Sequence, residues 1–294
     1  MKLFEPAKLG SMAPASKLII YGLLGLWTFI VLFPLYWLIV TSVKLPIHVA
    51  DGPVYLPFVD YTPSLHAWRY IFVDLGRDTF RPYLNSVIVA VLSSILAVGA
   101  GSMAAYALSR LEFRPRLISI GLFILGVAGT VVAVTLAGVN WRVAAAAGLA
   151  LTLIVIRAAR GVPSPELGNS DILFWMISQR ILPPVVAAIP IYVMFQQVGM
   201  LDTHFALIVT YTTVNLPIVV WLMYDFFSTV PKDLEESAEL DGASRFRIFF
   251  EIVLPLAKPG LVATSLLVLI LAWNEYLLAL FLSTANAQTI PILV

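Results

Sequence analysis

Polar side chains interrupt several stretches of this sequence that are otherwise almost free of charge. Asn274 and Glu275, for example, lie between Trp273 and Tyr276. Amides and carboxylates can hydrogen-bond the hydroxyls of a polyhydroxyl solute while a neighbouring aromatic ring covers its apolar face. Buried Asn and Thr also hold membrane helices together, so both interpretations stay open. The candidate contacts of a solute pathway are Asn85, Tyr211, Thr212, Thr213, Asn215, Trp273, Asn274 and Glu275.

Residues 229–259 have the composition of a docking surface. Pro231 suits the first position of a helix that runs to Leu240, and acidic residues follow where the helix dipole favours anions. Gly242 can take positive φ at little cost, and Ser244 can cap a second helix. We therefore expect two short helices with a sharp turn between them.

The second of these helices has one apolar face. Its apolar residues recur at i, i+3, i+4, i+7 and i+8, and Pro255 is expected to end it. One alternative is a helix that lies in the lipid headgroup layer. Anionic lipid would repel the acidic residues nearby, which favours a protein partner. The apolar residues are Phe246, Phe249, Phe250, Val253 and Leu254, and the acidic ones are Glu235, Glu236, Glu239 and Asp241.

Other kinds of chemistry find little support. The chain has no cysteine, and its three histidines, His48, His66 and His204, lack metal-ligand spacing. No nucleophile is paired with a base, and no G-x-x-x-x-G-K-[ST] phosphate loop is present. A net charge of +1 argues against nucleic-acid binding. We therefore predict no catalytic residue, no metal and no cofactor held by this chain.

The composition places the chain in a membrane, with 60% hydrophobic and 12% charged residues. A helix that crosses the hydrocarbon core needs about 20 apolar residues. The sequence therefore predicts an all-α integral membrane protein. Seven spans are expected, at residues 18–43, 83–108, 117–138, 141–156, 172–198, 205–228 and 260–282.

The basic residues indicate the orientation. With residues 1–17 as a cytoplasmic tail, twelve of the 18 Lys and Arg residues lie inside and five outside, and Arg180 lies within a span. Residues 229–259 then face the cytoplasm, and residues 44–82 form an external loop. Arg180 lies about 12 Å along its helix and is expected to extend toward the cytoplasmic interface. Asp225 is expected to be a solvated or paired helix end.

The segment from Glu236 to Ala243, ESAELDGA, is followed by Phe249, Ile252, Leu254 and Pro255 and resembles the EAA loop of ATP-binding-cassette importer permeases. Further segments are similar to the carbohydrate-uptake branch of that family. They are Asn85-Ser86, residues 104–111 (AAYALSRL), Leu182-Pro183-Pro184, residues 199–203 (GMLDT) and residues 272–276 (AWNEY). The similarity covers most of residues 18–294, except roughly 118–170.

The resemblance implies the fold of a type I importer permease in the bacterial inner membrane. It also implies cytoplasmic ATPase subunits that hold ATP and Mg, a second permease, and an external solute-binding protein that delivers a sugar or polyol. Two alternatives remain: an importer for another solute, or a membrane scaffold or enzyme whose loop recruits a partner. The residues implied to dock on the ATPase are Glu235, Glu236, Ala238, Asp241, Gly242, Ala243, Phe249, Ile252 and Pro255.

The sequence departs from the family pattern in two places. Residues 118–170 are an insertion, which we interpret as an extra transmembrane hairpin that faces lipid and is accessory to transport. Two additional spans leave the sidedness of the later loop unchanged. The chain also stops at Val294, where family members continue through one more span, so we expect the last helix to be missing.

Overall fold

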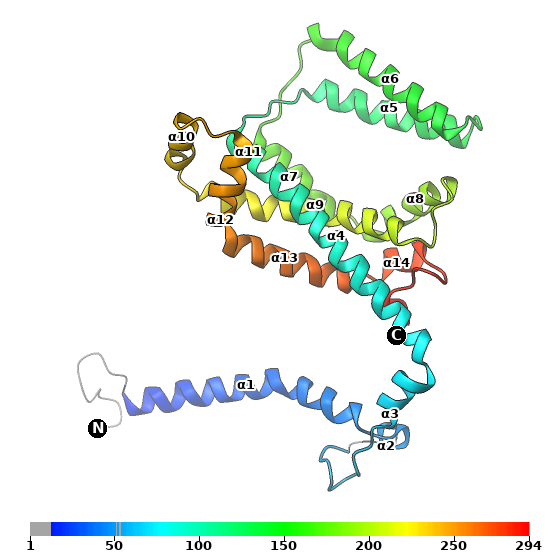
Figure 1. Cartoon of the computed structure of the whole chain (residues 1–294), viewed down its shortest axis with the longest axis vertical. Helices are drawn as coiled ribbons and strands as arrows, with labels where there is room; N and C mark the ends of the chain where they lie inside the picture. Colours follow the sequence, from blue (N-terminus) through cyan, green and yellow to red (C-terminus); the bar gives the residue numbers. More distant parts are fainter. Residues whose placement is uncertain (1–12, 51, 53, 294) are drawn as a thin grey trace. The chain divides into compact units, whose positions relative to one another are not determined.

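The computed structural model describes residues 13–50, 52 and 54–293, so most of the expected 1–17 tail lies outside the described residues. Within the described residues the chain is helical, and no β-strand is formed (Figure 1). It divides into two compact units, one that ends at Arg81 and one that starts at Pro82.

The first unit contains one long apolar helix and a folded segment after it. Helix α1 (Pro14–Ser42) agrees with the expected span at residues 18–43. Short helices α2 (Pro46–Ala50) and α3 (His66–Arg69) and a π-helical turn η1 (Tyr70–Asp74) follow. Lys44 is buried there, with its ammonium 4.2 Å from the centre of the Trp37 ring. Residues 44–82 therefore contain helices, and the buried Lys44 side chain connects their start to Trp37 of α1.

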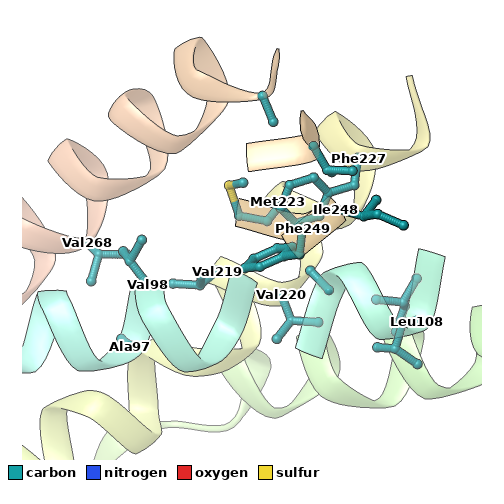
Figure 2. Close-up of a cluster of buried hydrophobic side chains, with 14 residues drawn as sticks. Ala97, Val98, Leu108, Val219, Val220, Met223, Phe227, Ile248, Phe249 and Val268 are labelled. Atoms are coloured by element: carbon teal, nitrogen blue, oxygen red, sulfur yellow. The ribbon is translucent and has the colours of Figure 1, made fainter. Parts of the chain in front are cut away.

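The second unit is built around helix α9 (His204–Ser228), whose buried face includes Leu207, Val219 and Phe227. Helices α7 (Asn169–Ser178), α13 (Lys258–Trp273) and α14 (Leu277–Leu282) contact it. Helix α4 (Gly76–Arg110) shares its hydrophobic core (Figures 1 and 2). The long apolar helices α4 and α9 confirm the spans predicted at residues 83–108 and 205–228.

The prediction of one continuous span at residues 172–198 is wrong. Helix α7 and a 3-10 turn η3 (Gln179–Ile181) are followed by α8 (Pro184–Gln197), with a bend of 90° between them. The reason is Pro183-Pro184, because proline donates no backbone N–H and pushes the residue before it out of the helical region. Leu182 accordingly has ψ of 133°.

The span predicted at residues 260–282 is also interrupted. Helix α13 ends at Trp273 and α14 begins at Leu277. Two polar side chains satisfy backbone groups at this break: Asn274 Nδ2 donates to the carbonyl oxygen of Ile270, and Glu275 Oε1 accepts from the N–H of Leu278. An average of hydropathy over this stretch does not reveal such a break.

Helices α5 (Leu117–Thr135) and α6 (Trp141–Ala158) form a hairpin and agree with the spans predicted at residues 117–138 and 141–156. Gly126 lies against Thr152, and Gly148 lies against Thr130, with no room for a Cβ at either glycine. Small residues of this kind let membrane helices approach closely. We refer to α5 and α6 with their connection as the α5–α6 hairpin.

The loop between α8 and α9 is clamped to the segment after α14 by Asp202. Its carboxylate accepts hydrogen bonds from the backbone N–H groups of residues 284 to 287, at 2.8–3.2 Å. Burial alone would raise the pKa of this carboxyl, but the four backbone donors outweigh it and hold the pKa well below its usual range. The end of the bundle opposite α10 is thereby fixed.

Candidate functional site

A cavity of about 480 Å³ lies where the two helix breaks meet α9. Its volume falls within the range of small-molecule sites. In a membrane protein, irregular backbone is tolerated where it is buried in protein or lines a cavity, which accounts for both breaks at this place. The lining residues are Gln179, Arg180, Leu182, Pro183, Pro184, Val186, Ala187 and Ile191 from the first break, Thr213, Val214, Asn215 and Pro217 from α9, and Leu271, Glu275 and Leu278 from the second.

Three of the polar residues expected along a solute pathway reach this cavity, namely Thr213, Asn215 and Glu275. Asn215 is buried, and its Nδ2 donates to the carbonyl oxygen of Tyr211 at 3.0 Å. Its Oδ1 accepts from Nη2 of Arg180 at 2.6 Å, so both polar atoms of this side chain have a partner within the protein.

Asn85 lies elsewhere, at the start of the buried part of α4. Its Nδ2 donates to the carbonyl oxygens of Asn286 and Gln288, both at 2.9 Å, and its Oδ1 lies 2.7 Å from Nε2 of His204. Both polar atoms of this side chain are thus engaged, Nδ2 with the segment after α14 and Oδ1 with the start of α9. The geometry gives Asn85 a structural role at that position.

The remaining four pathway candidates do not line the cavity, and each contacts another group of the protein. Tyr211 donates to the backbone oxygen of Glu275 at 3.3 Å, and Thr212 donates to that of Ser93 at 3.4 Å. The ring of Trp273 packs edge-on against Tyr83, with centroids 6.0 Å apart. Asn274, as described above, satisfies the end of α13.

The expectation that Arg180 extends to the interface is wrong. Its Nη2 donates to Oδ1 of Asn215 at 2.6 Å, so the guanidinium stays inside the bundle. The cause is the break that follows at Pro183, which ends the helix at Ile181 and turns the chain beside α9. The sequence did contain a signal for this break. Arg180 lies shortly before the Pro183-Pro184 pair in an apolar run, and the expectation that it extends to the interface did not take that pair into account.

At the other end of the bundle, residues 232–256 form the α10–α12 loop. It consists of α10 (Lys232–Leu240), α11 (Arg245–Ile248), a π-helical turn η4 (Phe249–Val253) and α12 (Leu254–Leu256). Gly242 turns the chain with φ of +81°, and the Ser244 side chain accepts from the N–H of Arg247. The predicted pair of short helices, its turn and its cap are confirmed.

Two details of that prediction need correction. Pro231 is the N-cap residue, and the helix begins at Lys232. Pro255 does not end the second helix, which continues to Leu256. The π-helical turn before it widens the hydrogen-bond pattern, so that the missing N–H of proline is accommodated.

A buried ion pair holds the α10–α12 loop against the bundle. Glu235 Oε1 lies 2.6 Å from Arg110 Nη2, and the two side chains are only 10% and 11% exposed. Tyr106 donates its hydroxyl to Glu235 Oε2 at 2.8 Å. Arg110 also donates to the carbonyl oxygens of Phe227 and Val230 at the end of α9. One cluster therefore joins α4, α9 and α10.

Phe249 supplies an apolar anchor beside this cluster. It is buried, and Figure 2 shows its ring among Met223, Phe227 and Ile248. Its centroid lies 5.0 Å from that of Tyr106 and 5.9 Å from that of Phe227, at distances typical of favourable aromatic pairs. Phe249 and Val253 on the apolar face of the second helix thus pack on the chain's own bundle, whereas Phe246 and Phe250 stay exposed.

The residues expected to dock on a partner fall into three groups. Glu235 and Phe249 are buried inside the chain, and Ala238, Ala243 and Ile252 are half-buried against the same core. The exposed ones are Glu236, Asp241, Gly242 and Pro255.

Two large apolar side chains stand out on the exposed tip of the loop, Leu240 at 90% and Phe246 at 71% exposure. Sequence reasoning did not single out Leu240. Leu240 lies directly before the Asp241-Gly242 turn, at the end of an acidic helix, and this position was the sequence signal for an exposed apolar residue.

Comparisons with known proteins show which family has this arrangement. The chain is 32% identical over 271 residues to the trehalose/maltose transport system permease protein MalG of Thermococcus litoralis, covering 91% of this chain and 76% of that protein. It is 29% identical over 268 residues to the diacetylchitobiose uptake system permease protein NgcG of Streptomyces coelicolor, covering 90% and 68%.

A solved structure has the same fold: a bacterial ABC transporter involved in the import of the acidic polysaccharide alginate, with a TM-score of 0.59 and 22% identity over 95% of this chain and 78% of that one. Residues 169–293, which include both helix breaks and the α10–α12 loop, match the family described as binding-protein-dependent transport system inner membrane component. With its apolar spans and its similarity to transport permeases over nearly its whole length, the chain belongs to this family of ATP-binding-cassette transporter permeases.

Proposed function

We propose that this chain is the membrane-spanning permease subunit of an ATP-driven importer for a sugar or polyol. The α10–α12 loop faces the cytoplasm, as does the N-terminus, and its exposed tip docks into a separate ATPase subunit that binds ATP and Mg. A second permease and an external solute-binding protein complete the importer. The sugar relatives support this class of solute.

The observation that carries the proposal is the contrast between the tip and the base of the loop. The tip exposes Glu236, Leu240 and Phe246, whereas the base is fixed by Glu235 and Phe249. A partner that grips the tip therefore pulls on α4 and α9 through buried contacts. An attachment of this kind would pass movement of an ATPase on to the membrane helices.

The same helices lead from the loop to the cavity. Phe227, which packs on Phe249, and Asn215, which lines the cavity, are separated by twelve residues of α9, or about 18 Å. Helix α13 follows the loop after a bend of 82° and ends next to the cavity residue Glu275. Rotation of the loop would therefore move two walls of the cavity, which is how we propose that ATPase closure alternates access to the solute.

The direct test uses the reconstituted importer, with the ATPase, the second permease and the binding protein in proteoliposomes. Radiolabelled trehalose, maltose and diacetylchitobiose serve as probes. Glu236→Lys and Gly242→Pro change the exposed tip, and proline cannot adopt the positive φ of Gly242. We expect uptake and solute-stimulated ATP hydrolysis to disappear together in both variants.

Glu112→Lys is the matched control, because Glu112 is an exposed acid outside the loop, with its side chain 82% exposed. It should leave both activities intact. Unchanged uptake in correctly inserted Glu236→Lys and Gly242→Pro variants would refute the docking proposal. Crosslinks from Leu240 that capture lipid and never the ATPase would refute it as well.

A further inference from the structure

Arg180 and Glu275 place opposite charges on one cavity that is otherwise mostly apolar. Ionisable groups inside membrane proteins are costly and commonly mark solute or ion pathways. Arg180 comes from the break before α8, and Glu275 from the break between α13 and α14. Two separate irregular segments thus each bring one charged group to the same space.

The guanidinium of Arg180 is only partly engaged by the protein. Nη2 donates to Asn215 Oδ1 at 2.6 Å. Its Nε is buried and has no hydrogen-bond partner among the residues that the structure describes. A buried donor without an acceptor costs free energy, so the guanidinium is left one acceptor short in this conformation while its residue lines the cavity.

Glu275 is likewise only partly engaged. Oε1 accepts from the N–H of Leu278 at 3.1 Å. Its charge is close enough to interact with that of Arg180, yet within the described part of the chain no ion pair of 4.0 Å or less joins them. The two charged groups therefore lie near each other without direct contact, with cavity space beside both.

We propose that Arg180 and Glu275 form a two-point binding site for a neutral polyhydroxyl solute, in which one hydroxyl accepts from the guanidinium and a neighbouring hydroxyl donates to the carboxylate. This inference rests on the proposed function and names the contacts that this chain makes with its cargo. Vicinal sugar hydroxyls present a donor and an acceptor side by side. Hydrogen bonds to charged groups are about twice as strong as neutral ones, so two of them suffice to orient a sugar ring.

The charge balance of the site makes it selective. One positive and one negative group leave the cavity without net charge, so Glu275 disfavours an anionic sugar and Arg180 disfavours a cationic one. A neutral saccharide satisfies both groups. The site therefore differs in kind from one suited to an acidic saccharide.

The experiment measures binding to the purified permease and ATPase complex in nanodiscs by saturation-transfer NMR, which detects weak affinities, together with initial uptake rates in cells. Trehalose is the neutral probe and an alginate disaccharide the acidic one. We expect Arg180→Gln and Glu275→Gln each to raise the Kd for trehalose about ten- to hundredfold, the loss of one hydrogen bond to a charged group. Glu275→Gln should also gain affinity for the acidic probe, because it leaves the cavity with a net positive charge.

The double variant Arg180→Gln/Glu275→Gln separates solute binding from mere charge neutralisation. It removes both charges at once. If the two charges served only to neutralise each other, the double variant would bind trehalose with the wild-type Kd. That result would overturn the inference. We expect the Kd to stay raised at least about tenfold while insertion is normal. Arg114→Gln, at an exposed arginine with 68% side-chain exposure, is the control and should bind as wild type.

Failure of the inference differs from failure of the proposed function. Wild-type uptake of trehalose together with an unchanged Kd in both single variants would overturn the two-point site alone. Wild-type cells that take up no neutral or acidic sugar would overturn the proposed function and the site with it.

Discussion

The α10–α12 loop and the α5–α6 hairpin both extend from the helical bundle, but they are attached to it in different ways. The loop inserts Glu235 and Phe249 among α4 and α9. Of the residues in the most apolar stretch of α5, 0% are buried, and the corresponding share for α6 is 11%. The two helices pack chiefly on each other. Hydropathy alone would rank the hairpin as the more firmly embedded of the two. Buried side-chain contacts show instead that the loop is the more firmly attached of the two.

The connections of the hairpin are confined to its base. The N–H of Leu117 donates to the carbonyl oxygen of Pro165, and that of Leu167 donates to Pro115. Arg116 reaches back to the carbonyl oxygens of Ala159 and Arg160. These bonds close the insertion on itself, so movement of the hairpin need not move the bundle. Four predictions test this contrast.

The largest effect is expected when the buried ion pair of the loop is broken. Glu235→Ala leaves Arg110 charged and buried without its partner, which typically costs about 3–5 kcal/mol. We expect a marked fall in the thermal unfolding temperature of the purified complex and loss of solute-stimulated ATP hydrolysis. Differential scanning fluorimetry and a coupled ATPase assay measure the two.

Glu251→Ala is the control for that variant. Glu251 pairs with Arg247 in the same loop, but its side chain is 61% exposed, and such surface pairs contribute about 0–1 kcal/mol. Equal effects of the two substitutions would show that burial of the Arg110 pair does not fix the loop.

Phe249→Ala should have the next largest effect. Loss of a buried Phe side chain costs about 3–5 kcal/mol, through lost burial and the cavity left behind. Phe250→Ala removes the neighbouring ring, which is 53% exposed, and should cost less than half as much. Unfolding temperatures of the two variants measure the difference. If Phe250→Ala were the more damaging, the second helix would face the bundle with the opposite side.

The sequence predicted the long helices and the existence of the loop because both have strong local signals. Runs of about 20 apolar residues specify spans, and Pro231, Gly242 and Ser244 mark the ends of short helices. What the apolar face of the second helix packs against could not be predicted in the same way. Periodicity places Phe249 on one face of a helix, but the same pattern fits a partner's groove, a lipid surface or the chain's own core.

The cavity was only partly predictable for a related reason. Asn215 and Glu275 stand out as polar residues within apolar runs, and both line it. The bend of 90° at Pro183 does not follow from the presence of proline alone, since prolines also occur inside continuous helices such as α9, at Pro217. Without that bend, Arg180 is assigned to the wrong environment. The full set of cavity residues therefore required the structure.

A smaller effect is expected inside the hairpin. Gly126→Leu forces a side chain into the space of Thr152 and should separate α5 from α6. Gly129→Leu on the same helix is the control, because nothing lies within 4 Å of the Cβ it would add. Limited proteolysis of the connection between α5 and α6 should accelerate in the first variant only. Sugar uptake should stay within about twofold of wild type in both, and a selective loss in Gly126→Leu would show that hairpin packing reaches the pathway.

The smallest effect is expected from removal of the hairpin. Arg116 and Glu166 form an isolated antiparallel bridge, so their Cα atoms lie about 4.5–5.5 Å apart and a two-residue Asn-Gly turn can join them. Asn169, which caps α4 by donating to the carbonyl oxygens of Leu108 and Leu111, is retained. Replacement of residues 117–165 by Asn-Gly should therefore leave insertion, unfolding temperature and uptake close to those of the full chain. Since the deletion takes out two spans, the α10–α12 loop stays on the same side of the membrane. Loss of uptake in a deletion variant of normal stability would mean that the hairpin acts on transport through the bilayer or a partner, because its own contacts with the bundle are too few to explain it.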